Sequence, residues 1–148
     1  PVMILEDGKV IFDSRVITRY LDNFAGSNLY PQDKIYDILT LEALADGIME
    51  SAVSITYESK LRPQNEQSPS WMEAQWSKVL HAIKALDDGQ FQAMDSEMNM
   101  GQIAVACALG YLDFRHDARK WRSGHSNLAS WNDKMMKLPA LIKTIPTD

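Results

Sequence analysis

The first residues of the chain place two short apolar runs around a polar segment. Residues 2–5 and 10–12 are apolar or β-branched, and Glu6-Asp7-Gly8-Lys9 lies between them. Asp-Gly between such runs is a strong hairpin signal, because a type I′ turn requires positive φ at both central residues. The pattern predicts one antiparallel β-hairpin closed by a type I′ turn.

After the hairpin the apolar positions change to helical spacing. These apolar positions share one helical face and are Val16, Ile17, Tyr20, Leu21 and Phe24. Asp13 or Ser14 is suited to the N-cap of this helix, and Gly26 is suited to its C-terminal stop. Two strands and one helix are marginal in water alone. Residues 1–26 are therefore expected to form part of a larger α/β unit.

Everything beyond Asn28 is expected to be helical. A long helix of ~40 Å is predicted between Pro31 and Pro63, and a second from Ser68 or Ser70 to residues 87–89. A third, over residues 98–112, is apolar nearly all round, which is typical of the middle of a bundle. A short helix near residues 128–135 follows, and Pro139 and Pro146 are expected to break the tail.

The third helix carries two features of its own. Asn99 with Gln102 three residues later forms a variant of the capping box. Cys107 lies among apolar residues, and we expect it to be buried, with a raised thiol pKa and no access for a substrate. Trp71, Trp76, Trp121 and Trp131 are expected to lie in the core or an interface.

Composition narrows the function classes. Fifteen basic against 20 acidic residues give a net charge of −5, which argues against nucleic acid or an anionic membrane as partner. The single Cys excludes an intrachain disulfide and suits a reducing compartment, so we expect a cytoplasmic protein. No apolar run approaches the roughly 20 residues that span a bilayer.

The spacing of the histidines does not indicate a metal-binding site. His81, His116 and His125 form no His-x-x-x-His or Glu-x-x-His pattern. We expect no metal site, and histidines that are solvated or cap helices. No Gly-rich phosphate loop is present, and no serine lies in a nucleophile-elbow context.

The dipeptide Asp13-Ser14 is the candidate for binding chemistry. A hydroxyl and free backbone N–H groups at a helix start can hold a carboxylate. An adjacent Asp can take an ammonium group. Together they can receive an α-amino acid head group, although a plain helix cap explains the same two residues.

The order of these features resembles the glutathione S-transferase superfamily. The resemblance rests on Pro1-Val2-Met3-Ile4-Leu5, Asp7-Gly8 and Val10-Ile11-Phe12-Asp13-Ser14, on the linker-like Asn28-Leu29-Tyr30-Pro31, on Gly101-Gln102-Ile103-Ala104, on Trp131 and on the closing Pro139, Thr144 and Pro146. It implies a mainly α fold: residues 1–27 as the C-terminal hairpin and helix of a thioredoxin-like glutathione-binding domain, and residues 28–148 as an all-α C-terminal domain.

The resemblance also assigns residues. Pro1 matches the family's cis-proline, and Asp13 and Ser14 match the pair that grips the γ-glutamyl group of glutathione. Asn99-Met100-Gly101-Gln102 departs from the usual Ser/Thr-x-x-Asp capping box, which puts the subclass in doubt. No residue matches the family's thiol-activating Ser, Tyr or Cys, so the start at Pro1 is interpreted as entry into the domain in mid-fold.

The resemblance implies a bacterial-type glutathione transferase, a homodimer that conjugates small electrophiles in detoxification, with glutathione as substrate and no metal. Two alternatives stay open: a non-catalytic interaction module, and a glutathione-dependent isomerase or dehalogenase. Glu42, Asp46, Met49, Val53 and Tyr57 of the long helix are candidates to line the electrophile site between the domains, where the family places it.

Overall fold

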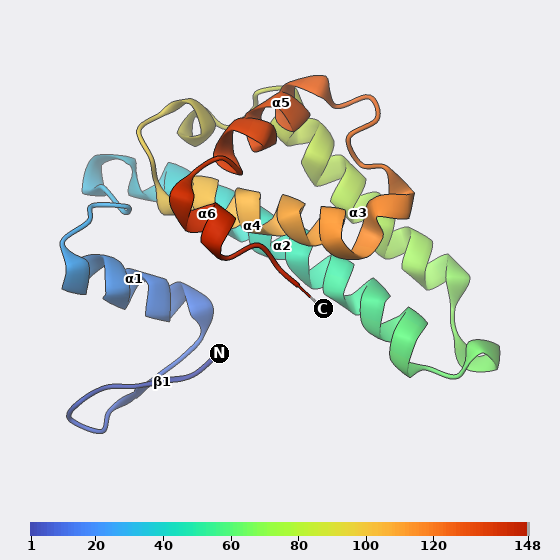
Figure 1. Cartoon of the computed structure of the whole chain (residues 1–148), viewed down its shortest axis with the longest axis horizontal. Helices are drawn as coiled ribbons and strands as arrows, with labels where there is room; N and C mark the ends of the chain where they lie inside the picture. Colours follow the sequence, from blue (N-terminus) through green and yellow to red (C-terminus); the bar gives the residue numbers. More distant parts are fainter. Residues whose placement is uncertain (148) are drawn as a thin grey trace.

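The chain forms a small β-hairpin, a helix that follows it, and a bundle of helices that holds the core (Figure 1). The computed structural model describes residues 1–147. Its elements are β1 (Met3–Ile4), β2 (Val10–Ile11), α1 (Ser14–Ala25), α2 (Ile35–Leu61), α3 (Pro69–Asp87), α4 (Met100–His116), α5 (Ser126–Met135) and α6 (Pro139–Lys143), with 3₁₀ turns at Gln32–Lys34, Gln64–Glu66, Gln92–Asp95 and Asp117–Arg119.

The predicted hairpin is present, but its turn is of another type. The strands are antiparallel, with Met3 opposite Ile11 and Ile4 opposite Val10. The Gly8 N–H donates to the Leu5 carbonyl at 2.9 Å, and Gly8 alone of residues 5–9 has positive φ, +81°. A type I′ turn is therefore wrong: the glycine takes the left-handed position that ends a three-residue hairpin loop.

Helix α1 begins and ends where the sequence predicts. Asp13 is its N-cap and accepts a hydrogen bond from the Arg15 N–H, while Gly26, at φ +64°, closes it in the left-handed conformation. No residue of α1 is buried. Its apolar Phe24 is 76% exposed, so α1 adds little to the core of the described chain.

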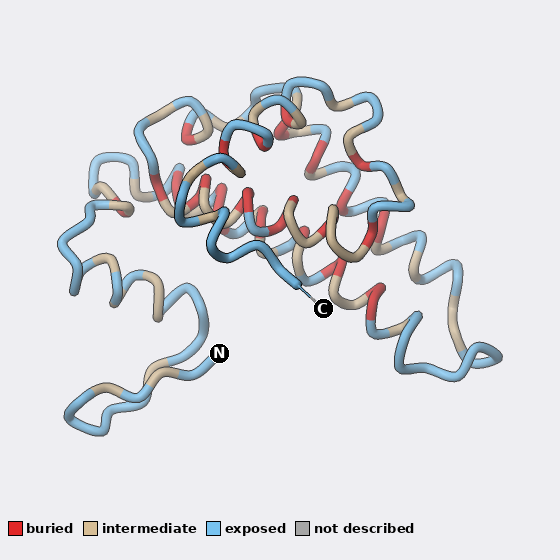
Figure 2. The backbone as a smooth tube through the Cα atoms, in the orientation of Figure 1, coloured by how far each residue is buried: buried red, intermediate tan, exposed pale blue. Residues whose placement is uncertain are grey.

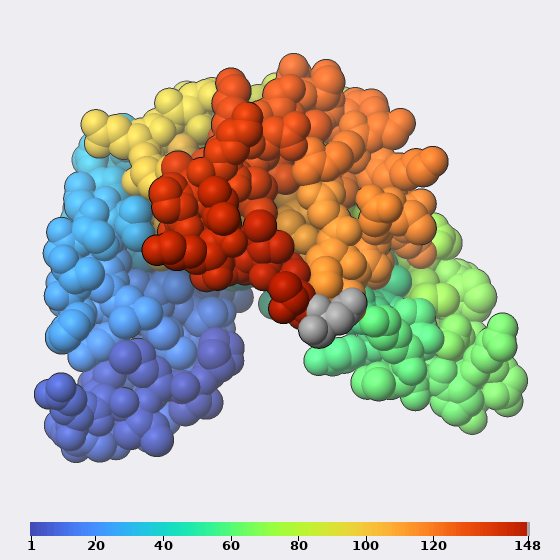
Figure 3. Space-filling model, in the orientation of Figure 1, coloured from blue at the N-terminus to red at the C-terminus, as the bar shows by residue number. Residues whose placement is uncertain are grey.

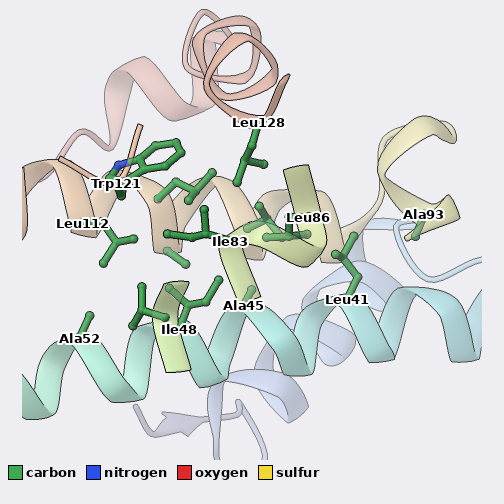
Figure 4. Close-up of a cluster of buried hydrophobic side chains, with 14 of the residues drawn as sticks. Leu41, Ala45, Ile48, Ala52, Ile83, Leu86, Ala93, Leu112, Trp121 and Leu128 are labelled. Carbon is green, nitrogen blue, oxygen red and sulfur yellow. The ribbon is translucent and has the colours of Figure 1, made fainter. Parts of the chain in front are cut away.

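The core lies between α2, α3 and α4 (Figure 2). Figure 4 shows Leu41, Ala45, Ile48 and Ala52 projecting from α2 toward side chains of the other helices. The backbones of α2 and α4 approach closely at Gly101, where an added Cβ would lie 2.9 Å from the Leu41 Cβ and 3.0 Å from the Ile38 carbonyl. Glycine at this position permits the contact.

The capping box of α4 is confirmed. Asn99 Oδ1 accepts from the Gln102 N–H at 3.1 Å, and Gln102 Oε1 accepts from the Asn99 N–H at 3.3 Å. The side-chain amides of both residues also donate to the Ala93 carbonyl. The box thus fixes the preceding loop as well as the helix start.

Three expectations are wrong. Cys107 is exposed rather than buried, because its side of the apolar helix α4 is not covered in the described chain. His116 is buried and hydrogen-bonded, neither solvated nor a simple cap. Pro139 starts the short helix α6 instead of breaking one, since proline is well tolerated in a first turn.

Candidate functional site

The three residues assigned from the sequence gather at the amino end of α1. Met3 pairs with Ile11, so Pro1 lies at the outer end of one strand beside the strand that leads into Asp13. Figure 1 shows the N-terminus close to the start of α1. Pro1, Asp13 and Ser14 are all exposed, so this corner is open to a ligand.

The start of α1 carries hydrogen-bond donors, the N–H groups of its first turn, and an acceptor, the Asp13 carboxylate. N–H groups of a first helical turn have no partner within the helix and lie at the positive end of its dipole. Here the carboxylate of Asp13 caps the Arg15 N–H at 3.1 Å through Oδ1. Ser14, the next residue along the chain, is exposed and brings a hydroxyl and a first-turn backbone N–H. A ligand bearing both a carboxylate and an ammonium group fits this pairing.

Arg15 turns away from this corner toward α2. Its Nε lies 2.9 Å from Asp46 Oδ2 but 4.0 Å from Asp13 Oδ2. Burial raises the pKa of the Asp46 carboxyl, and the Arg15 charge lowers it in part. Asp46 thereby holds the guanidinium, and the Asp13 carboxylate keeps an oxygen for another cation.

Tyr30 joins α1 to α2 behind the site. Its hydroxyl donates to Glu42 Oε1 at 2.7 Å and lies 2.9 Å from Thr18 Oγ1, and the Arg19 guanidinium lies over its ring. Burial raises the pKa of Tyr30. Burial also raises the pKa of the Glu42 carboxyl. The hydrogen bond from Tyr30 lowers this pKa in part, and the charge of Asp46 raises it further.

This network was not predicted from the sequence. Tyr30 stood only as part of a linker, and Glu42 only as a candidate lining residue. Neither sits in a recognisable motif. A buried Glu within an otherwise apolar helical stripe was the one available signal, because such a residue needs a partner.

A wide recess lies between the amino-terminal corner and the tip formed by α2 and α3 (Figure 3). The candidate residues of α2 divide among different environments. Glu42 is buried, Asp46 is paired with Arg15, Met49 packs on the core, and Tyr57 is 61% exposed. They do not form a single lining.

The tryptophans divide in the same way. Trp76 and Trp121 are buried in the core, Trp131 packs against it, and Trp71 is half-exposed beside a cavity of about 410 Å³ near the end of α2.

Within residues 1–147, no cluster of three or more His, Cys, Asp or Glu side chains is arranged to hold a metal ion. No helix in that range is both long and apolar enough to cross a membrane.

A hairpin leading into a capped helix, joined by a linker to an all-helical bundle, is the arrangement of glutathione-transferase-like proteins. The family model "Glutathione S-transferase, C-terminal domain" matches residues 69–133. The chain is 30% identical to the uncharacterized GST-like protein YibF of Escherichia coli K12, over 99% of this chain and 74% of that protein.

Solved structures give the same picture. A glutathione transferase family member from Pseudomonas fluorescens Pf-5, with bound glutathione, is 39% identical with a TM-score of 0.95, over all of this chain and 74% of that one. A glutathione S-transferase from Methylobacillus flagellatus KT with glutathione bound is 34% identical with a TM-score of 0.88, over 99% and 75%. The chain therefore belongs to the glutathione S-transferase superfamily.

Proposed function

We propose that this protein is a glutathione transferase that holds glutathione at the amino end of α1 and delivers its thiol to a small electrophile. The observation that carries the proposal is the pairing of Asp13 with Ser14 at an exposed helix start. Relatives of the same superfamily hold glutathione in their structures. The proposal includes a glutathione-binding unit over residues 1–27 and a helical domain over residues 28–148.

The γ-glutamyl group of glutathione carries one carboxylate and one ammonium. Ser14 takes the carboxylate with its hydroxyl and backbone N–H, assisted by the helix dipole. Asp13 takes the ammonium with Oδ2, which lies 4.0 Å from the Arg15 Nε. Pro1, at the outer end of the neighbouring strand, shapes the wall along which the cysteinyl part lies.

The reaction breaks the S–H bond of glutathione, whose proton passes to solvent water. It forms a C–S bond between the sulfur and an electrophilic carbon, which releases a leaving group or accepts the electron pair within a π-system. We assign the activation of that thiol to no residue of this chain. Cys107 is exposed on α4, but partial desolvation raises the pKa of its thiol, which disfavours the thiolate, and we assign it no role in the reaction.

We further infer a cytoplasmic homodimer that acts in detoxification. The single Cys suits a reducing compartment. The apolar residues Phe12 and Phe24 of the amino-terminal unit are more than two-thirds exposed and suit contact with a second copy of this chain.

Binding is tested by calorimetry with glutathione. Ser14→Ala and Asp13→Ala should each weaken binding about tenfold, because each removes a hydrogen bond to a charged group. Ser130→Ala, an exposed serine on α5, is the matched control and should leave the affinity unchanged. Unaltered affinity in both site variants contradicts the placement of the site.

Activity is tested by product analysis over a panel of electrophiles with glutathione. A glutathione conjugate supports the transferase. An isomerised or dehalogenated product that retains no glutathione points to the related isomerase or dehalogenase chemistry. Binding of glutathione without any product identifies an interaction module instead.

A further inference from the structure

A chain of oxygen atoms runs from Glu42 to the residue that we assign to glutathione. Glu42 Oε1 lies 2.7 Å from the Tyr30 hydroxyl, which lies 2.9 Å from Thr18 Oγ1, which lies 2.9 Å from the Ser14 carbonyl oxygen. The chain crosses from α2 through the linker into the first turn of α1. It ends on the peptide group between Ser14 and Arg15.

The number of protons decides how many of these contacts are hydrogen bonds. With an ionised Glu42, Tyr30 and Thr18 supply two protons for three contacts. Tyr30 then donates to Glu42, and the single Thr18 proton goes either to Tyr30 or to the carbonyls of Ser14 and Arg15, which lie 2.9 and 3.2 Å from Thr18 Oγ1. With a neutral Glu42, the bond to Tyr30 reverses: the carboxyl O–H donates to the Tyr30 hydroxyl in place of the opposite donation, Tyr30 donates to Thr18, and Thr18 donates to the Ser14 carbonyl, so that all three contacts are satisfied.

The surroundings of Glu42 favour its neutral form. The residue is 4% exposed, and no described group donates to its Oε2. An ionised carboxylate with one unpartnered, buried oxygen is unfavourable. The charges that face it are Arg15 and Arg19 from α1 and Asp46 from α2, with Tyr30 from the linker; the net effect of burial and these groups is a raised pKa of the Glu42 carboxyl.

We propose that Glu42 is a positioning residue for glutathione: uncharged, it fixes the Ser14 carbonyl through Tyr30 and Thr18, and its ionisation releases that carbonyl and loosens the grip on the γ-glutamyl group. This inference rests on the proposed function of Ser14. The site is then weakened as pH rises through the titration of Glu42.

The first test follows the affinity for S-methylglutathione, which carries no thiol to titrate, between about pH 5 and about pH 8. The wild-type affinity should fall about threefold across this range, as expected for one net hydrogen bond lost. Glu42→Gln should hold the high affinity throughout, since its amide N–H donates to Tyr30 as the neutral carboxyl does. Glu50→Gln, exposed on the same helix, should behave like the wild type.

The second test needs no ligand. In ¹⁵N-resolved NMR spectra of the full chain, the amide of Arg15 should shift with the titration of Glu42, and Glu42→Gln should abolish that component. Tyr30→Phe should abolish it too, because the relay loses its middle oxygen although Glu42 still titrates. A shift that survives Tyr30→Phe overturns the relay.

The two proposals can fail separately. If the wild-type protein does not bind S-methylglutathione but the Arg15 amide responds to Glu42 alone, the relay stands and the glutathione site is wrong. If binding occurs and its pH profile is the same in Glu42→Gln, the positioning role of Glu42 is wrong.

Discussion

At the scale of single residues, several buried polar groups of this protein are held by definite hydrogen-bond partners. His116 is one example, far along the chain from the start of α1. Its Nε2 lies 2.9 Å from the Ala52 carbonyl and 3.1 Å from Thr56 Oγ1, and Tyr111 donates to the same Thr56. These bonds tie the end of α4 to α2 through a neutral imidazole.

The titration of His116 should make stability depend on pH. Burial lowers the pKa of the imidazole below its ordinary value of 6.5. The unfolded chain therefore binds a proton before the folded one, and the free energy of unfolding should fall as pH drops below about 6.5. Urea unfolding between about pH 5 and about pH 7.5 measures this slope.

The variant His116→Gln should lose that part of the slope, because an amide does not titrate. His81→Gln, at an exposed position on α3, should keep it. If the free energy of unfolding changes equally with pH in the wild type and in His116→Gln, the role assigned to His116 is wrong.

At the scale of helices and strands, local signals were predictable from the sequence and contacts between elements were not. Asn99 with Gln102, and Asp13 with Gly26, mark helix ends because their bonds stay within a few residues. The turn type at Gly8 depended on which residue takes the left-handed conformation, which Asp-Gly alone does not decide. The exposure of Cys107 depended on what packs beside α4, which no local pattern contains.

The contact between α2 and α4 gives a prediction at this scale. Gly101→Ala places a methyl group against the Leu41 side chain and the Ile38 carbonyl, and should lower the free energy of unfolding by about 1–3 kcal/mol, as overpacking does. Gly110→Ala, on the same helix, meets nothing within 4 Å and should raise stability by up to about 1 kcal/mol through helix propensity. Denaturant unfolding of the two variants should move in opposite directions.

At the scale of the whole molecule, the apolar core belongs to the helices after the linker. The hairpin and α1 are joined to them through the Arg15–Asp46 ion pair and the hydrogen bonds of Tyr30. An ion pair that is partly exposed contributes at most about 1 kcal/mol. The candidate site therefore lies on the less firmly held part of the described chain. The sequence pattern contained no sign of how this part is attached to the helical bundle.

Native-state hydrogen exchange should distinguish α1 from the helices of the core by their protection against exchange. Amides of α1 should exchange through local opening well before global unfolding, whereas those of α2 and α4 should exchange at the global limit. Glutathione should slow exchange in α1 selectively if it binds there. Equal protection of α1 and α4 in the free protein is the outcome that contradicts this division.

The segment from Ser27 to Tyr30 has a consequence for protein engineering. The Leu29 N–H donates to Asp22 of α1, the Leu29 carbonyl accepts from the Met100 N–H at the start of α4, and Tyr30 contacts α1 and α2. One inserted residue would displace Tyr30 by up to about 3.6 Å and could not preserve all of these bonds. A chimera that exchanges the hairpin and α1 between relatives must therefore keep the length of this segment, because the segment is hydrogen-bonded to α1, α2 and α4 at once.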